Sequence, residues 1–268
     1  MTAFRWIEGS GEIVADGKRL EAVAHGPRPD MAPTIVMLHE GLGCVALWRD
    51  FPARLAEATG WGVFAYSRAG YGRSDPVALP RPLDYMSREA RSSLPIALEA
   101  IGFEQGILLG HSDGASIATI YAGERSDERV KGLVLMAPHL FTEEPGLASI
   151  AEARRAYETG DLKPRLAKYH AYADNAFRGW NGAWLDPGFK AWNIEDAVTR
   201  WRTPALVIQG ADDQYGTLKQ VRAIEALSPA PVESVILEDC RHSPQIDQPQ
   251  ATLDAVAAFC ARVRGPPK

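Results

Sequence analysis

One stretch near the middle of the chain restricts the fold most, because it joins a strand, a sharp turn and a helix without a linker. Residues 106–110 form an apolar run typical of a buried strand, and residues 115–122 are typical of a helix. Between them lies GHSDG at 110–114, where glycines flank Ser112. Such a turn projects the serine hydroxyl into open space, and it leaves no room for side chains at the flanking positions. The stretch therefore predicts that Ser112 is a catalytic nucleophile.

The rest of the chain alternates strands with helices in the same manner. The first 25 residues are predicted to form short strands at an antiparallel edge, and Ser87 and Gly102 to begin and end one helix. Apolar strands that alternate with helices favour an α/β fold with a mostly parallel central sheet and helices on both faces. The expected strands are 34–38, 62–66, 106–110, 130–137, 205–209 and 234–237, and the expected helices are 49–59, 87–101, 115–122 and 250–262.

Residues 140–201 interrupt this alternation. Two helix-like segments, 147–158 and 162–174, are followed by an aromatic cluster that contains Trp180, Trp184 and Trp192. We interpret the stretch as a helical cap inserted into an α/β core made of residues 1–139 and 202–268. An ordinary pair of surface helices is the alternative. The tryptophans would line an apolar pocket if they face inward, and packing within the cap is the equal alternative.

Composition and charge exclude several classes of function. The 29 basic and 34 acidic residues give a net charge of −5 without a basic patch, so we expect no nucleic-acid or membrane partner. No apolar stretch approaches the roughly 18 residues that span a bilayer. The three cysteines form no CxxC pair, and the histidines lack zinc spacing, so we expect no metal and no cofactor. A cytoplasmic enzyme with a small-molecule substrate is the expectation, and the oligomeric state is left open.

A serine nucleophile needs a base and an acid, and the chain order supplies both. His242 lies in a polar loop after the last predicted strand, and this is the position that a catalytic histidine takes in the order serine, acid, histidine. Asp212 and Asp213 follow the strand at 205–209. Adjacent side chains point in different directions, so only one of the two aspartates is expected to reach the histidine.

Together these segments resemble the α/β-hydrolase superfamily from about residue 20 to the C-terminus. GHSDG, QGADD at 209–213, EDCRHSP at 238–244 and HEGLG at 39–43 carry the resemblance. The family pattern favours Asp213 over Asp212 as the acid. The HEGLG segment is similar to the HGGPG oxyanion loop of proline iminopeptidase-like and ester-hydrolase members. That similarity implies an oxyanion hole formed by the Gly41 and Asp113 N–H groups.

Two further residues are candidates for substrate binding. Glu40 replaces the glycine usual in the family, and it could bind a cationic substrate group, pair with Arg68 or Arg73, or face solvent. His139 follows the strand at 130–137, where it could line the pocket or fill a structural role.

The predicted reaction is hydrolysis of a small carboxylic ester through an acyl-enzyme. A carbon–carbon hydrolase of a ring-fission product would use the same three residues, with Arg165 or Arg178 to bind the substrate carboxylate. A cofactor-free oxygenase would rely on the His–Asp pair without the serine. A binding module on this fold would need no activated nucleophile, so the intact Ser112, Asp213 and His242 set argues against it.

Overall fold

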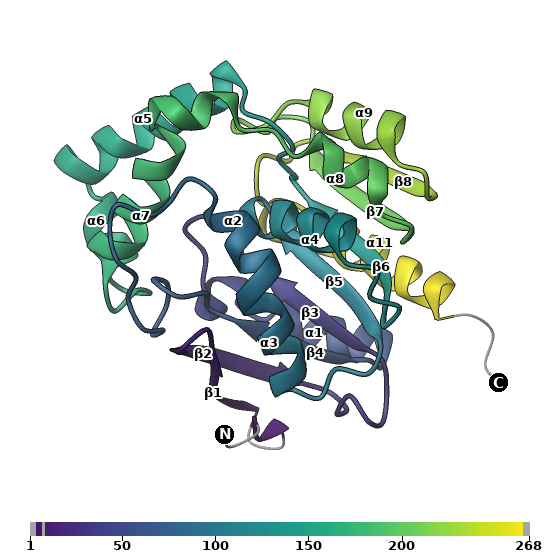
Figure 1. Cartoon of the computed structure of the whole chain (residues 1–268). Coiled ribbons are helices and arrows are strands. Elements are labelled where there is room, and N and C mark those ends of the chain that lie inside the picture. The colour runs from purple at the N-terminus through teal and green to yellow at the C-terminus, as the bar shows by residue number, and fades with distance from the viewer. Residues whose placement is uncertain (1–3, 7–8, 265–268) are drawn as a thin grey trace.

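The computed structural model describes residues 4–6 and 9–264, and an eight-stranded sheet runs through its centre (Figure 1). The strands follow the spatial order β1-β2-β4-β3-β5-β6-β7-β8. Their bounds are β1 Ser10–Ala15, β2 Lys18–His25, β3 Thr34–Leu38, β4 Gly62–Tyr66, β5 Gly106–His111, β6 Val130–Met136, β7 Ala205–Gly210 and β8 Val232–Leu237.

The N-terminal strands form the antiparallel edge of this sheet. β1 pairs with β2, and β2 pairs with β4, both antiparallel, whereas β4, β3, β5, β6, β7 and β8 are parallel to one another. Asp16 and Gly17 join β1 to β2, and both have positive φ angles, as a two-residue hairpin turn requires. The predicted antiparallel edge is confirmed for the described residues, since 1–3 and 7–8 lie outside them.

Alternating residues of the central strands enter two separate cores, one on each face of the sheet. In β3, Ile35 and Met37 contribute to one core, while Val36 and Leu38 contribute to the other. Helices α1 and α11 cover the first face, and α3, α4, α8 and α9 cover the second. Burial on both faces explains why these strands are apolar throughout, and it confirms the predicted helices on both faces.

The helices lie around the sheet and beyond one end of it. Their bounds are α1 Phe51–Thr59, α2 Tyr85–Arg88, α3 Leu94–Ala100, α4 Asp113–Glu124, α5 Glu144–Thr159, α6 Leu162–Leu166, α7 Ala173–Trp184, α8 Glu195–Arg200, α9 Leu218–Leu227, α10 Pro244–Asp247 and α11 Pro249–Val263. Short 3₁₀ segments cover Val45–Trp48 (η2) and Pro187–Ala191 (η4), and a π-helical turn (η3, Glu89–Ser93) joins α2 to α3.

Two helix predictions were wrong in detail. Ser87 lies inside α2, which begins at Tyr85, although Gly102 has the positive φ expected just after a helix. The single helix predicted over 162–174 is two helices, because the chain between α6 and α7 binds a distant loop. There the His170 ring accepts a hydrogen bond from the Gly72 N–H at 2.9 Å, and the Ala171 N–H donates to the Gly72 carbonyl at 2.8 Å.

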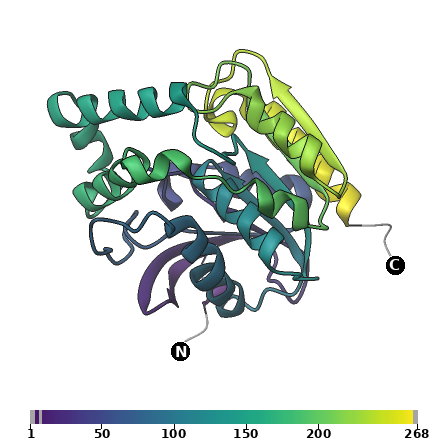
Figure 2. The ribbon, with the colours of Figure 1, turned by 45° about the horizontal axis from the view of Figure 1, so that its top comes forward.

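Helices α5, α6 and α7, which follow β6, project away from the sheet (Figure 2). Figure 2 shows α5 and α7 side by side beyond the strands, and the Asn181 side chain of α7 joins them by donating to the Ile150 carbonyl at 2.9 Å. In contrast, α8 packs on α4, and Gly123 is a glycine because a Cβ there would collide with the Ala197 backbone. The division at residues 139 and 202 stays a prediction.

Candidate active site

Ser112 occupies a strained turn between β5 and α4. Its φ of 54° and ψ of −117° lie in a region that side-chain-bearing residues rarely adopt. A Cβ at Gly110 would collide with the Gly114 backbone, and one at Gly114 would collide with the Leu38 carbonyl. The backbone therefore comes too close for larger residues at both flanking positions, as the sequence predicted.

Asp213 and His242 meet at the carboxyl end of the sheet. His242 Nδ1 lies 2.9 Å and 2.8 Å from the two carboxylate oxygens of Asp213. The same carboxylate accepts hydrogen bonds from the Tyr215 N–H at 2.8 Å and the Gln209 amide at 2.7 Å. Burial opposes ionisation of Asp213, but the charge and hydrogen bond of His242 lower its pKa to about 2. Asp212 is exposed, so Asp213 is the aspartate that reaches the histidine.

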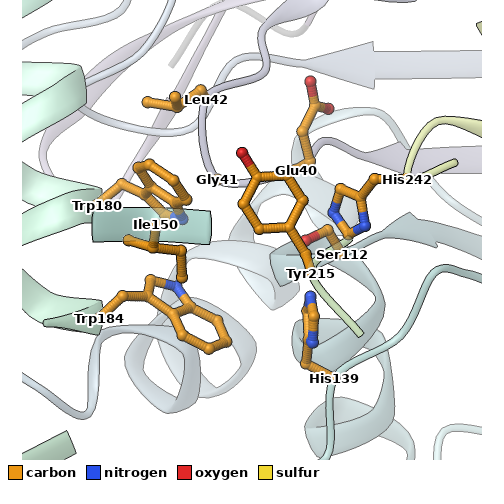
Figure 3. A pocket seen from close by; sticks show the side chains of 10 residues that line it. All are labelled: Glu40, Gly41, Leu42, Ser112, His139, Ile150, Trp180, Trp184, Tyr215 and His242. Atoms are coloured by element: carbon orange, nitrogen blue, oxygen red, sulfur yellow. The ribbon is translucent and has the colours of Figure 1, made fainter. Parts of the chain in front are cut away.

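Ser112 and His242 line the same cavity, as Figure 3 shows. Within the part of the chain that the structure describes, no hydrogen bond joins the Ser112 hydroxyl to the His242 ring. Catalytic hydrogen bonds are often long or poorly aligned before substrate binds, so this geometry is compatible with a nucleophile–base pair.

The loop after β3 brings Gly41 to this cavity. A Cβ at Gly41 would collide with the indole of Trp180, which explains the glycine. Buried Arg68 fixes the loop, since its guanidinium donates to the carbonyls of His39 and, at 3.2 Å, Glu40. The His39 ring is neutral, because burial places its pKa well below the usual value, and its Nε2 accepts from the Arg68 N–H at 3.0 Å.

The Asp113 carboxylate links the turn at Ser112 to helix α7. Its side chain is fully buried, and it accepts hydrogen bonds from the Tyr85 hydroxyl and, at 3.2 Å, from the Trp184 indole N–H. Arg68 Nη2 lies 3.9 Å from Asp113 Oδ2. The sequence assigned a role only to the Asp113 backbone, so this network was missed. An acidic residue at the junction between a buried strand and a buried helix was the available signal, since buried charges require partners.

Glu40 lies beside His111 rather than beside Arg68 or Arg73, so of the three alternatives considered for Glu40 the ion pair with an arginine is not formed. Its Oε2 lies 3.4 Å from His111 Nδ1, while the Arg68 guanidinium is occupied by backbone carbonyls. His111 Nε2 lies 2.7 Å from the His242 carbonyl, which only accepts, so Nε2 carries a proton. Although burial lowers the pKa of His111, the Glu40 carboxylate outweighs it and raises that pKa above the usual value.

The cavity has a volume of about 140 Å³, and helices from the predicted cap form one wall. Figure 3 shows Trp180 and Trp184 across the cavity from Tyr215 and His242. The sequence did not identify Tyr215, although it lies only two residues after Asp213. The lining residues are Glu40, Gly41, Leu42, Ser112, His139, Ile150, Trp180, Trp184, Tyr215 and His242.

His139 lines this cavity as a neutral group. Burial is the main cause that lowers its pKa to about 3, and the nearby His242 ring, 5.6 Å away between centroids, acts in the same direction. Its ring nitrogens have no hydrogen-bond partner among the described residues. An imidazole that is 5% exposed and has free nitrogens beside a cavity is suited to bind a ligand.

Three other candidates lie outside the cavity. Trp192 packs behind Trp184, with ring centroids 5.7 Å apart. Arg165 and Arg178 are exposed and face Asp161 and Asp174 on the surface, so neither could bind a substrate carboxylate in this cavity.

Residues 4–6 and 9–264 contain no group of three or more His, Cys, Asp or Glu side chains that could hold a metal ion. Nor do they include a helix whose length and apolar character would let it cross a bilayer.

Known proteins resemble this chain in sequence and in fold. A model described as the Alpha/beta hydrolase family matches residues 35–255. Epoxide hydrolase B of Mycobacterium tuberculosis is 33% identical over 118 residues, which are 44% of this chain and 32% of that protein. The (Lyso)-N-acylphosphatidylethanolamine lipase of Homo sapiens is 32% identical over 128 residues, which are 47% of this chain and 36% of the lipase. The chain thus spans about a third of the length of these relatives.

Among solved structures, the enol-lactonase from Burkholderia xenovorans LB400 superposes with a TM-score of 0.72. The superposition covers 94% of this chain and all of the enol-lactonase, at 19% identity. At that identity the likeness shows the fold alone.

Proposed function

This chain belongs to the α/β-hydrolase family, and from that premise we propose that it is a hydrolase that cleaves small carboxylic esters through Ser112, His242 and Asp213. The observation that carries the proposal is the Asp213–His242 pair. The pair is joined at 2.8 Å and lies on the cavity that also holds the strained Ser112. A carboxylate, an imidazole and an alcohol in this order form the set that activates a serine.

In the proposed reaction, His242 Nε2 removes the proton of Ser112 as the hydroxyl oxygen attacks the ester carbonyl carbon. The Nδ1–H donates to Asp213, which fixes the tautomer and stabilises the imidazolium that forms. Collapse of the tetrahedral intermediate breaks the bond to the leaving alcohol, which takes the proton from His242. Water, deprotonated by the same imidazole, then attacks the acyl-enzyme and releases the acid and Ser112.

The Gly41 and Asp113 N–H groups are the proposed donors to the oxyanion. Gly41 lines the cavity, and Asp113 is the first residue of α4, where backbone N–H groups have no intrahelical acceptor. Loss of one such donor typically costs about 3 kcal/mol of transition-state stabilisation.

An ester is favoured over a carboxylate-bearing ring-fission product by the charges that line the cavity. Among the described residues, the wall of the cavity contains no lysine or arginine, but it contains the acidic residue Glu40. A substrate carboxylate would therefore meet a like charge without a compensating cation.

The test is Ser112→Ala, with Ser116→Ala as the matched control. Ser116 lies one turn further along α4, and its hydroxyl donates to the His139 carbonyl at 2.6 Å, so it should not react. We expect hydrolysis of p-nitrophenyl esters and labelling by a fluorophosphonate to vanish in Ser112→Ala, and labelling to persist in Ser116→Ala. Turnover and labelling that survive in Ser112→Ala would refute the assignment. Oxygen uptake that survives in that variant would instead favour the oxygenase.

A further inference from the structure

The described wall of the cavity carries one carboxylate and no lysine or arginine. Among the described residues that line it, Glu40 is the only one of the Asp, Glu, Lys and Arg type. The side chain of Glu40 is 25% exposed, so solvent reaches part of it. His139 is neutral and does not offset the charge.

The partner of Glu40 lies on the side away from the ligand. His111 is fully buried and does not line the cavity, and its Nδ1 faces Glu40 Oε2 at 3.4 Å. Burial raises the pKa of Glu40, but the hydrogen bond and charge of His111 outweigh it, so the carboxylate stays ionised. Of these two residues only Glu40 lines the cavity, so a ligand there lies closer to the carboxylate than to His111 and interacts more strongly with the closer group.

Gly43 makes this arrangement possible. A Cβ at position 43 would collide with the Glu40 carboxylate, so the glycine leaves the space that the carboxylate occupies. The loop is held below by Arg68, which donates to the Glu40 carbonyl. Glu40 is thus fixed at the wall by its backbone and by His111, rather than free to turn into solvent.

Aromatic rings form two other sides of the cavity. Trp180, Trp184 and Tyr215 line the cavity, and Figure 3 shows the two indoles facing the space in front of Tyr215. Aromatic faces attract cations through the ring quadrupole, and the attraction is larger where water is excluded. A cavity lined by one carboxylate-bearing residue and several aromatic rings is suited to an ammonium group.

We propose that this cavity selects esters that carry a positively charged group, and that Glu40 is the residue that recognises the charge. The inference rests on the proposed ester hydrolysis and adds the substrate class to it. Neutral esters of the same shape should be poorer substrates, and esters with a carboxylate, such as hydrogen succinates, poorer still.

Two pairs of esters of matched shape test the proposal. Acetylcholine is compared with 3,3-dimethylbutyl acetate, and ethyl 4-(trimethylammonio)butyrate is compared with ethyl 5,5-dimethylhexanoate. The charge lies on the alcohol in the first pair and on the acyl group in the second. The readout is the ratio of kcat/KM for the charged ester to kcat/KM for the neutral ester. Comparison of this ratio between proteins cancels the intrinsic reactivity of each ester.

We expect Glu40→Gln to lower this ratio by about tenfold for at least one pair, because it removes the charge and keeps the shape. Asp212→Asn is the matched control, since it removes one negative charge from the exposed loop after β7 and should leave the ratio within twofold. Ratios that stay within twofold in Glu40→Gln for both pairs would overturn the proposal.

A binding experiment on the unaltered protein separates this inference from the proposed function. Choline and 3,3-dimethyl-1-butanol differ in charge but not in shape, and each is titrated against the tryptophan fluorescence of the protein, to which Trp180 and Trp184 contribute. Tighter binding of choline, without hydrolysis of any ester, would refute the proposed function and keep the charge recognition. Hydrolysis of esters with equal binding of the two alcohols would refute the charge recognition alone.

Discussion

Replacement of His139 by phenylalanine should remove part of the acid sensitivity of the fold. The imidazole is packed against Trp184 and His242, with ring centroids 5.3 Å and 5.6 Å away, and is 5% exposed. Burial lowers its pKa from 6.5 to about 3. Because the folded protein disfavours the charged form, the unfolded chain binds a proton that the folded chain does not bind between these two pH values. Burial of His139 therefore does not reduce the free energy of unfolding above pH 6.5, and it reduces that free energy increasingly as the pH falls.

The magnitude follows from the two pKa values. Linkage between proton binding and folding predicts that His139 makes the free energy of unfolding about 2 kcal/mol smaller at pH 5 than at pH 7. The assay is urea unfolding of the wild type and His139→Phe at both pH values. Subtraction of one protein's change from the other's isolates His139, because the remaining groups are common to both. Phenylalanine fills a similar volume and does not titrate, so the variant should lose about 2 kcal/mol less on acidification.

Equal losses in the two proteins, within about 0.5 kcal/mol, would refute the reasoning, because they would mean that the imidazole is not held neutral by its burial. A larger loss in His139→Phe would have the same consequence.

The remaining predictions concern the catalytic residues and their support. Asp213→Asn should lower kcat for a p-nitrophenyl ester by about 10³–10⁴-fold, because His242 would adopt the wrong tautomer. Asp212→Asn should change kcat for the same ester less than threefold. Similar losses in the two variants would contradict the pairing of Asp213 with His242. Trp184→Phe removes a donor to the buried Asp113 carboxylate and should lower the free energy of unfolding by about 1–3 kcal/mol in urea. That loss should shrink when Asp113→Asn is already present, and an unchanged loss would show that the hydrogen bond does not stabilise the fold.

Local sequence was sufficient for the turn at Ser112 and for the layers of the fold. Positions 110 and 114 are glycines because other backbone atoms lie close to them, and these atoms belong to near neighbours in the chain and to the end of one adjacent strand. The apolar composition of each central strand indicates that both of its faces are buried, and this can be read from the strand alone. The order of strands along the chain then brought Asp213 and His242 to one end of the sheet.

Long-range contacts explain where the sequence prediction failed. Helical periodicity favours one helix over 162–174. Hydrogen bonds between residues 170–171 and the Gly72 backbone, about a hundred residues away in the chain, interrupt that helix. Similarly, charge alone suggests that Glu40 pairs with Arg68, yet the Arg68 guanidinium is directed at backbone carbonyls that no sequence pattern marks.

The order of residues along the chain thus contains the turn at Ser112, the parallel sheet and the approach of residues 212–213 to His242, because each depends on near neighbours or on strand order. The partner of Glu40, the neutrality of His139 and the walls of the cavity depend on side chains that meet only after the helices pack. Burial and distance set these properties, and neither is encoded within a short window of sequence.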